Sequence, residues 1–367
     1  MLGGHAQDTL IFIIHDEGIL QGNIDVCDEF SKNEIDEKNW YGYYPWGGVS
    51  IDANTYTDPT MVSTYNGLLH LNVDTVNQWR AFPDWMVDQN KKDKMKEGKV
   101  YINRLTSAIW SKKQFRFGYF ECRCLLPSGK GYWPAFWLYG GNPNEEIDIM
   151  EAKGERKKSY HVDVHCPNRC DRVKQFVVLD KPFGHWAKTA DNLQNRWVSF
   201  SGLWTPQGVL FYFNDQLIAK HRAQFNTSMN LIANFSLAAD GGPFSPGPTT
   251  TTKFPAAFKI DYIRSWNFEA LNNYSGFNAL KEASIIKVIP SGNNMVKFEI
   301  SSENLETHQV FIERESQRGD MDFEPYLELD LSAKEQFLDY TYWPKGNYYL
   351  RILNGTINQQ VKFIERF

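Results

Sequence analysis

Apolar and polar residues alternate with a period of two along much of this chain, which is typical of β-strands with one buried face. The alternation is clear at residues 68–73 and 160–166. Turn-forming residues separate such runs, for example the pair Asn66-Gly67. These observations predict an all-β protein, built as a sandwich or a barrel.

The segment Glu146-Ile-Asp-Ile-Met-Glu151 places three acids within six residues. On a strand, Glu146 and Asp148 share one face, and strict alternation would bury Glu151. A buried carboxylate without partners costs on the order of several kcal/mol. One extra residue, a β-bulge, returns Glu151 to the acidic face. Because a strip of like charges is destabilising, we expect it to bind a cation or to take part in chemistry. A surface strand with three solvated acids is the alternative.

Two carboxylates that face one groove are the arrangement that glycoside hydrolysis requires. The six-residue segment resembles the catalytic signature of glycoside hydrolase family 16, in the bulged form of its laminarinases, agarases and carrageenases. The resemblance implies that Glu146 is the nucleophile, Asp148 its assistant and Glu151 the acid/base. It implies retention of configuration without a metal or organic cofactor in the reaction. Glu145 has the opposite parity and is expected to lie outside the machinery.

The resemblance continues through residues 105–137, 196–216 and 230–266, and implies a jelly-roll sandwich over residues 8–268 with a concave substrate cleft. Trp133 and Trp137 share parity, so both are expected to line the cleft and stack on sugars, with core packing as the alternative. Pro134 between them predicts a bend or an edge strand.

Polar residues also alternate on the strand expected after the acids, where His161, Asp163 and His165 share a face. If this strand pairs with the acidic strand, that face borders the same groove. His165 resembles the family's histidine at this place, which implies that it holds sugar hydroxyls or tunes Glu151; a structural role is the alternative.

Asn234 is a candidate substrate-binding residue, because residues 230–238 resemble a strand at one end of the cleft. The tryptophan that usually follows the glycines of Asp240-Gly-Gly242 is absent, and Pro243-Phe244 stands there instead. This departure leaves the subsites, and therefore the polysaccharide, open.

Asp261 is the candidate metal ligand. It matches a family position that helps to hold a structural calcium ion, which takes oxygen ligands; a simple surface acid is the alternative. Among five cysteines, Cys166 and Cys170 can close a small loop, whereas Cys122 and Cys124 lie on one strand face and cannot easily pair. A zinc site is also conceivable, although its spacing fits no common structural pattern, from Cys166, Cys170, His161 and His165.

Two further parts follow the jelly roll. Residues 269–283 are predicted to be a linker, and the short alternating runs of residues 284–367 predict a small immunoglobulin-like β-sandwich. Its ending weakly resembles carboxy-terminal secretion-sorting domains of Bacteroidetes. Within the larger part, residues 74–99 interrupt the alternation and are expected to form a long loop with a lysine cluster.

The amino-acid composition limits the kinds of molecule that the protein is expected to bind. Aromatic residues make up 15% of the chain, including 12 Trp and 18 Tyr, which suits a β-rich core and sugar-stacking surfaces. The formal net charge of −5 argues weakly against nucleic acid and is compatible with neutral glycans. The apolar run at residues 10–14 is too short to span a membrane, and the start lacks the features of a signal peptide. We expect a secreted, periplasmic or cell-surface monomer whose signal peptide lies outside this sequence.

The sequence therefore predicts a retaining, endo-acting hydrolase of a β-linked polysaccharide. The resemblance to laminarinases favours β-1,3-glucan (laminarin) or mixed-linkage β-glucan. An endo-galactanase acting on agarose, porphyran or carrageenan is the alternative within this class. A protein of the same fold that binds glycans without cutting them is the alternative from another class.

Overall fold

The computed structural model describes residues 5–6, 8–14, 18–44, 49–50, 53–81, 95–141, 145–166, 184–190, 192–277, 279–292, 294–301, 308–315, 323–354 and 357–366. Within these ranges the elements are β-strands and a few 3-10 helices of three to five residues. The all-β prediction is therefore confirmed. No helix in the described part is long and apolar enough to cross a membrane.

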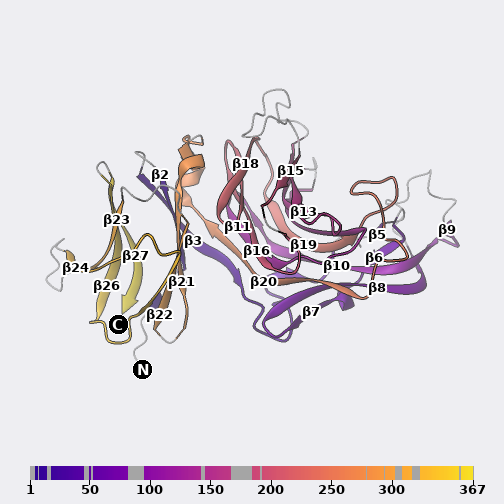
Figure 1. The fold of residues 1–367 in the computed structure, drawn as a ribbon, viewed down its shortest axis with the longest axis horizontal. Coiled ribbons are helices and arrows are strands. Elements are labelled where there is room, and N and C mark those ends of the chain that lie inside the picture. Colours follow the sequence, from indigo (N-terminus) through magenta and orange to yellow (C-terminus); the bar gives the residue numbers. More distant parts are fainter. Residues whose placement is uncertain are drawn as a thin grey trace.

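The larger part of the molecule is a jelly-roll β-sandwich of two antiparallel sheets (Figure 1). One of them, here called the front sheet, has the order β4 (Trp40–Tyr41), β10 (Lys99–Phe115), β19 (Met229–Leu237), β12 (Tyr132–Tyr139), β13 (Glu146–Ala152), β14 (Ser159–His165) and β15 (His185–Lys188). Strand β12 lies between β13 and β19, so the edge predicted from Pro134 is wrong. The ladder to β13 includes Ala135, the residue after this proline, but not the proline itself.

The opposite sheet, here called the back sheet, has the order β18 (Gln216–Arg222), β17 (Gly208–Phe213), β16 (Trp197–Thr205), β11 (Gly118–Leu125), β20 (Ala256–Asn267) and β3 (Gly18–Asp28). Strand β20 also pairs with β8 (Leu68–Ala81), which pairs with β7 (Val62–Tyr65). Strand β8 continues to Ala81, so the first part of the loop predicted for residues 74–99 is strand; residues 82–94 lie outside the described ranges.

A third, smaller sheet joins β8 and β10 to three short strands, β5 (Val49–Ser50), β6 (Thr55–Thr57) and β9 (Met95–Lys96). The main core fills the space between the front and back sheets. Phe136 of β12 and Ile147 of β13 belong to one buried cluster with Phe120 of β11 and Phe200 of β16. This packing fixes which face of the front sheet is turned away from the core.

The back sheet continues into the carboxy-terminal part of the chain. Strand β3 pairs with β2 (Thr9–Ile14), which pairs with β21 (Ser284–Pro290), followed by β22 (Met295–Ser301) and β25 (Glu335–Asp339). A second sheet packs on these strands, with the order β24 (Phe323–Glu328), β23 (Gln309–Glu315), β26 (Gly346–Asn354), β27 (Ile357–Arg366) and β1 (His5–Ala6). Figure 1 shows β2 and β21 between the two groups of strands.

Strand β2 belongs to two cores at once. Ile11 and Ile13 pack into the carboxy-terminal core, whereas Leu10, Phe12 and Ile14 pack against the outer face of the back sheet. Strand β2 therefore contributes both to the jelly roll and to the carboxy-terminal part. The predicted boundaries of the jelly roll, the linker and the carboxy-terminal part stay predictions.

The segment predicted as a linker is packed onto the body of the protein. It contains the 3-10 helices η4 (Glu269–Asn273) and η5 (Ala279–Glu282), and its buried Leu271 and Leu280 join the cluster on the outer face of the back sheet. Phe268, just before η4, lies so close to Gly22 that an added Cβ there would come within 2.5 Å of its ring. A side chain at residue 22 would therefore require the ring of Phe268 to move.

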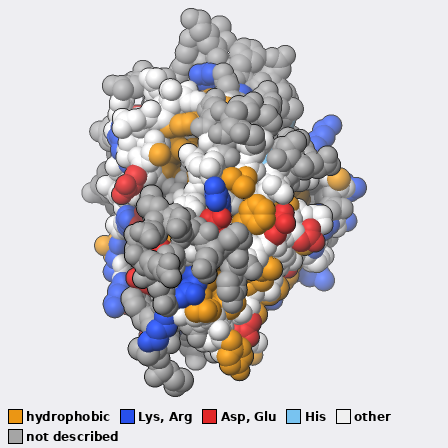
Figure 2. Space-filling view, turned by 90° about the vertical axis from the view of Figure 1, so that its left-hand side faces the viewer, with side chains coloured by type: hydrophobic (Ala, Val, Ile, Leu, Met, Phe, Trp, Pro, Cys, Tyr) orange, Lys and Arg blue, Asp and Glu red, His pale blue; other side chains and the backbone are white. Residues whose placement is uncertain are grey.

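Figure 2 shows the end of the molecule that the carboxy-terminal strands form, with hydrophobic side chains interspersed among Lys, Arg, Asp and Glu. Among the described residues of this part, the exposed large hydrophobic side chains are Leu327, Phe337 and Tyr342. They do not form a row of aromatic rings along one strand. The described residues of this face therefore do not indicate what the carboxy-terminal part binds.

Candidate active site

The predicted β-bulge is present in strand β13. Its pairing with both neighbouring strands shifts between Asp148 and Glu151: Asp148 lies opposite Asp163 of β14, and Glu151 lies opposite His161. Ile149 and Met150 are both buried in the core, so two residues occupy the place of one. As a result, all three acids lie on the face of the front sheet that is turned away from the core.

Asp148 is the most buried of the three acids, with 2% of its surface exposed. Burial raises its pKa well above the usual range, and the charges of Glu146 and Glu151 add to the effect. The hydrogen bond between the two side chains raises the pKa of Asp148 and lowers that of Glu146, so a proton shared by the pair is favoured on Asp148. The pKa of Glu146 is also raised, mainly by burial, while the nearby His165 and this hydrogen bond lower it.

Glu151 has a partner on each of its carboxylate oxygens. Trp133 Nε1 donates to Oε1 at 3.0 Å, and His161 Nδ1 lies 3.0 Å from Oε2. The contact with His161 can be a hydrogen bond whether the proton is on the imidazole or on the carboxyl, since Nδ1 donates to a carboxylate in one tautomer and accepts from a carboxyl in the other. Such an arrangement suits a group that gives up a proton and later takes one back.

The histidine in contact with Glu151 is His161 and not His165, whose predicted role stays a prediction. His165 lies opposite Glu146, and its Nε2 lies 3.1 Å from Oδ2 of Asp148. This is an ion-pair distance without hydrogen-bond geometry, because Oδ2 of Asp148 has no hydrogen-bond partner among the described residues. His165 is 46% exposed, so its other ring edge can meet a ligand. Sequence reasoning missed His161 as the partner of Glu151.

Trp137 and Asn234 form one unit on the same face. Trp137 Nε1 donates to Oδ1 of Asn234 at 2.7 Å, and Nδ2 of Asn234 donates to the Ser236 hydroxyl at 3.0 Å. Asn234 is buried, and both ends of its amide are occupied. It is therefore placed to orient Trp137, whose ring is partly exposed, and their roles toward a substrate stay predictions.

Trp133 is partly exposed beside Glu151, but a second aromatic ring covers one of its faces. Phe244, the residue that stands where the family usually has tryptophan, is stacked on it with centroids 4.5 Å apart and planes 11° apart. The sequence located both residues without predicting that they would meet.

Glu145 is buried on the other side of the strand and points away from the three acids. Its carboxylate accepts hydrogen bonds from the backbone of Asn226 and Thr227 and from the Thr227 hydroxyl. It ties the start of β13 to the turn before β19. The prediction that it lies outside the machinery agrees with this geometry.

The contacts of Cys166 and Asp261 argue against the zinc site and the calcium site that the sequence suggested. Cys166 takes part in a disulfide, so the alternative zinc site is wrong; Cys170 lies outside the described ranges, and Cys122 and Cys124 are free as predicted. Asp261 forms an ion pair with Arg123. A guanidinium on this carboxylate does not suit a calcium ion, so the surroundings of Asp261 do not support the calcium prediction.

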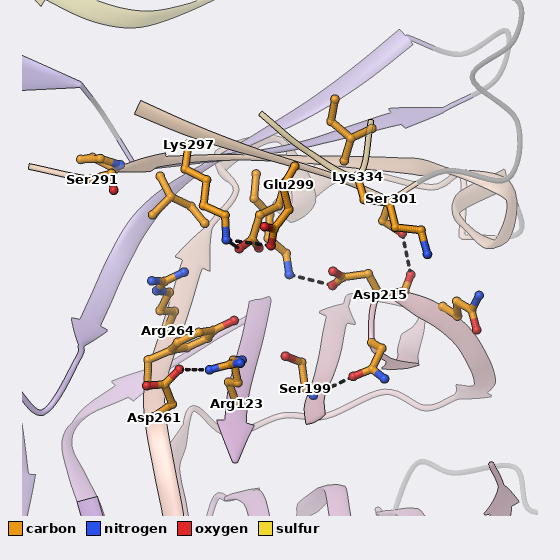
Figure 3. A pocket seen from close by; sticks show the side chains of 18 of the residues that line it. Arg123, Ser199, Asp215, Asp261, Arg264, Ser291, Lys297, Glu299, Ser301 and Lys334 are labelled. Atoms are coloured by element: carbon orange, nitrogen blue, oxygen red, sulfur yellow. Dashed lines mark hydrogen bonds and ion pairs between the residues drawn. The ribbon is translucent and has the colours of Figure 1, made fainter. Parts of the chain in front are cut away.

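A cavity of about 750 Å³ lies away from the acids, at the seam between the back sheet and strands β21 and β22 (Figure 3). Four of its cationic side chains are paired with carboxylates: Arg123, Arg264, Lys287 and Lys297. None of the three acids of β13 lines it. The candidate active site is therefore the exposed face of the front sheet.

Comparisons with known proteins show the family of the chain. The family description "Glycosyl hydrolases family 16" matches residues 52–264. A glucan endo-1,3-beta-glucosidase A1 of Niallia circulans is 26% identical over 290 residues, covering 70% of this chain and 40% of its own length. The chain thus spans less than half of that relative.

Solved structures show the same fold. An endo-beta-1,3-glucanase from Pyrococcus furiosus superposes with a TM-score of 0.54 at 21% identity, covering 68% of this chain and 95% of its own. Porphyranase B from Zobellia galactanivorans gives a TM-score of 0.52 at 18% identity, covering 67% and 94%. One fold thus serves proteins named for a glucan and for a porphyran.

Proposed function

This chain belongs to glycosyl hydrolase family 16, and from that premise we propose that it is an endo-acting, retaining hydrolase of a β-linked glucan. The observation that carries the proposal is the bulge in β13, which keeps Glu146, Asp148 and Glu151 together on the exposed face of the front sheet. Asp148 and Glu146 share a hydrogen bond, while Glu151 has separate partners. Two carboxyl groups in different surroundings can take different roles.

In the first step, Glu146 attacks the anomeric carbon as the C–O bond to the leaving sugar breaks. Glu151 gives its proton to the departing oxygen, and a glycosyl ester on Glu146 results. In the second step, Glu151 takes a proton from water, whose oxygen attacks the same carbon and frees Glu146. Asp148 supports the second step, since a proton on Asp148 stabilises the charge that returns to Glu146. Retention requires the two carboxyl groups to be about 5–5.5 Å apart.

For the substrate we propose β-1,3-glucan or mixed-linkage β-glucan. The relative from Niallia circulans, named for 1,3-linked glucan, supports this choice. The shared fold of porphyranase B keeps a galactan as the second candidate. Because a polysaccharide is too large to enter a cell, this function fits a secreted or cell-surface protein.

The test is to incubate the protein with laminarin, lichenan, agarose, porphyran and carrageenan and to follow reducing ends. A Glu146→Gln variant is the matched control, since it keeps the shape and loses the nucleophile. We expect cleavage of laminarin or lichenan by the wild type alone, with early products in the β configuration by NMR. Cleavage of a galactan alone would overturn the proposed substrate. Early products in the α configuration would overturn the proposed retaining mechanism. Inert protein that binds a glycan array would overturn hydrolysis itself.

A further inference from the structure

Phe244 contacts both residues that hold Glu151. Its ring lies flat on Trp133, at 4.5 Å and 11°, and edge-on to His161, at 5.8 Å and 84°. Among the described residues, Trp133 and His161 are the side chains within hydrogen-bond distance of the Glu151 oxygens. A single ring therefore restrains both partners of the same carboxyl group.

A second ring supports this arrangement from the side of β15. Trp186 packs 5.5 Å from Phe244 and 5.2 Å from His161, and the Arg156 guanidinium lies 3.9 Å from the centre of its ring. Together with Trp133 these rings surround the imidazole with apolar and aromatic surface. Glu151 is 9% exposed as a result of such neighbours.

The segment that carries Phe244 is held in an unusual conformation. Phe244 has a φ of 58°, in the left-handed region that bulky residues avoid. Asp240 accepts from the backbone of Gly247 at 2.9 Å, and Ser245 from that of Gly241 at 3.1 Å. Lys153, two residues after Glu151, donates to the carbonyl of Ser245. The contacts of the segment thus fix the ring over Trp133 although its backbone is disfavoured.

From these contacts we propose that Phe244 is a positioning residue for Glu151. It acts through Trp133 and His161: it fixes their rings so that the Glu151 proton points at the departing oxygen, and it keeps water from these two hydrogen bonds. This inference rests on the proposed function. It also means that Phe244, and not a sugar, occupies one face of Trp133.

The test compares leaving groups of equal size and different acidity. Aryl β-glycosides of the oligosaccharide that the wild type cleaves place the same ring at the same position, while less acidic phenols need more help from the general acid. For Phe244→Ala we expect kcat/KM to fall about 10- to 100-fold with a phenyl leaving group, as for partial loss of acid catalysis, and under about threefold with dinitrophenyl. Phe244→Tyr, which keeps the ring, should restore the wild-type dependence.

Phe254→Ala is the matched control. This aromatic ring packs against Tyr132 and has no ring contact with Trp133 or His161. It should leave the dependence on leaving-group acidity unchanged even if it lowers Tm. If Phe244→Ala does not fold, Phe244→Leu keeps the bulk without the flat ring and should show the same trend.

If Phe244→Ala lowers kcat/KM equally for all leaving groups, Phe244 contributes to substrate binding. If it lowers kcat/KM for none of them, Phe244 has no role in the site. Either result overturns the inference. The wild type serves as the separate check on the proposed function. If it hydrolyses neither the polysaccharides nor the aryl glycosides, the proposed function fails. If it hydrolyses them but Phe244→Ala leaves the dependence unchanged, the inference alone fails.

Discussion

The Asp148 carboxyl is expected to lower the stability of the protein while supporting its proposed activity. Burial raises its pKa well above the usual range, and the charges of Glu146 and Glu151 raise it further. The folded protein therefore binds more protons at this group than the unfolded chain does. The free energy of unfolding consequently decreases as the pH rises from the ordinary pKa of an aspartate through the raised value.

We expect Asp148→Asn to be more stable than the wild type at neutral pH, by about 1 kcal/mol or more, the scale of one pKa unit. An amide has the shape of a protonated carboxyl and no charge to bury. The difference should vanish below the ordinary aspartate pKa, where the wild type is protonated in both states. Activity should fall roughly tenfold, or about 1.4 kcal/mol, since an amide cannot exchange a proton with Glu146.

Urea unfolding of both proteins across this pH range measures the effect. A variant that is less stable than the wild type at every pH would show that Asp148 is ionised in the folded protein and paired with His165, which lies 3.1 Å away.

The sequence carried enough information to place the acids but not all of their neighbours. Parity and one extra residue put Glu151 beside Glu146 and Asp148. Counting outward from the turn after Ala152 also puts His161 opposite Glu151, so this partner was within reach. The stack of Phe244 on Trp133 was not, because residues 111 positions apart meet only through the course of a loop that local sequence does not encode.

At the scale of elements, the bulge in β13 controls which way the acids face. Ile149 and Met150 both point into the core and together lie between the pairs Asp148–Asp163 and Glu151–His161. On the other strand a single residue, Val162, fills the same interval. The bulge can therefore shrink by one residue without changing the face or the partner of Glu151, whereas one residue more would move Glu151 along the strand past His161.

We expect deletion of Met150 to leave measurable hydrolysis, because it makes β13 regular with the same pairings on either side. It should cost about 2–5 kcal/mol through the lost core side chain. Insertion of one alanine before Glu151 should abolish activity: regular alternation would keep the carboxyl on the same face, but it would move the carboxyl along β13 past His161. Turnover of laminarin and Tm are the measurements. Equal activity of the two variants would contradict this view of the strand.

Alternation predicted the strands well but their partners poorly. The run at residues 10–14 is apolar throughout because β2 is buried on both faces, by the carboxy-terminal core and by the outer face of the back sheet. The residues of this run do not predict that β21 is its neighbour in the sheet. In the same way, residues 269–283 are polar and turn-rich enough to predict a linker, yet Leu271 and Leu280 anchor them.

At the scale of the whole molecule, a buried charge connects the carboxy-terminal strands to the back sheet. Lys287 of β21 reaches Glu121 of β11 at 2.6 Å and Asp215, in the turn between β17 and β18, at 2.7 Å. Figure 3 shows Asp215 facing the strands that carry Lys297, Glu299 and Ser301. Because Lys287 and Glu121 are almost fully buried, water cannot replace either partner. We therefore expect the two parts of the chain to unfold together.

Lys287→Met tests this coupling. It leaves the Glu121 carboxyl buried without its cation, so we expect the free energy of unfolding to fall by about 3–5 kcal/mol. The matched control is Lys297→Met, whose partners Glu299 and Glu335 lie nearer to solvent and whose loss should cost about 0–1 kcal/mol. Adding Glu121→Gln to Lys287→Met should recover part of the loss, since no buried charge then lacks a partner there.

Urea unfolding followed by near-ultraviolet circular dichroism should show a single transition in the wild type. Two separate transitions in the wild type, or equal losses in the two lysine variants, would show that Lys287 does not join the two parts.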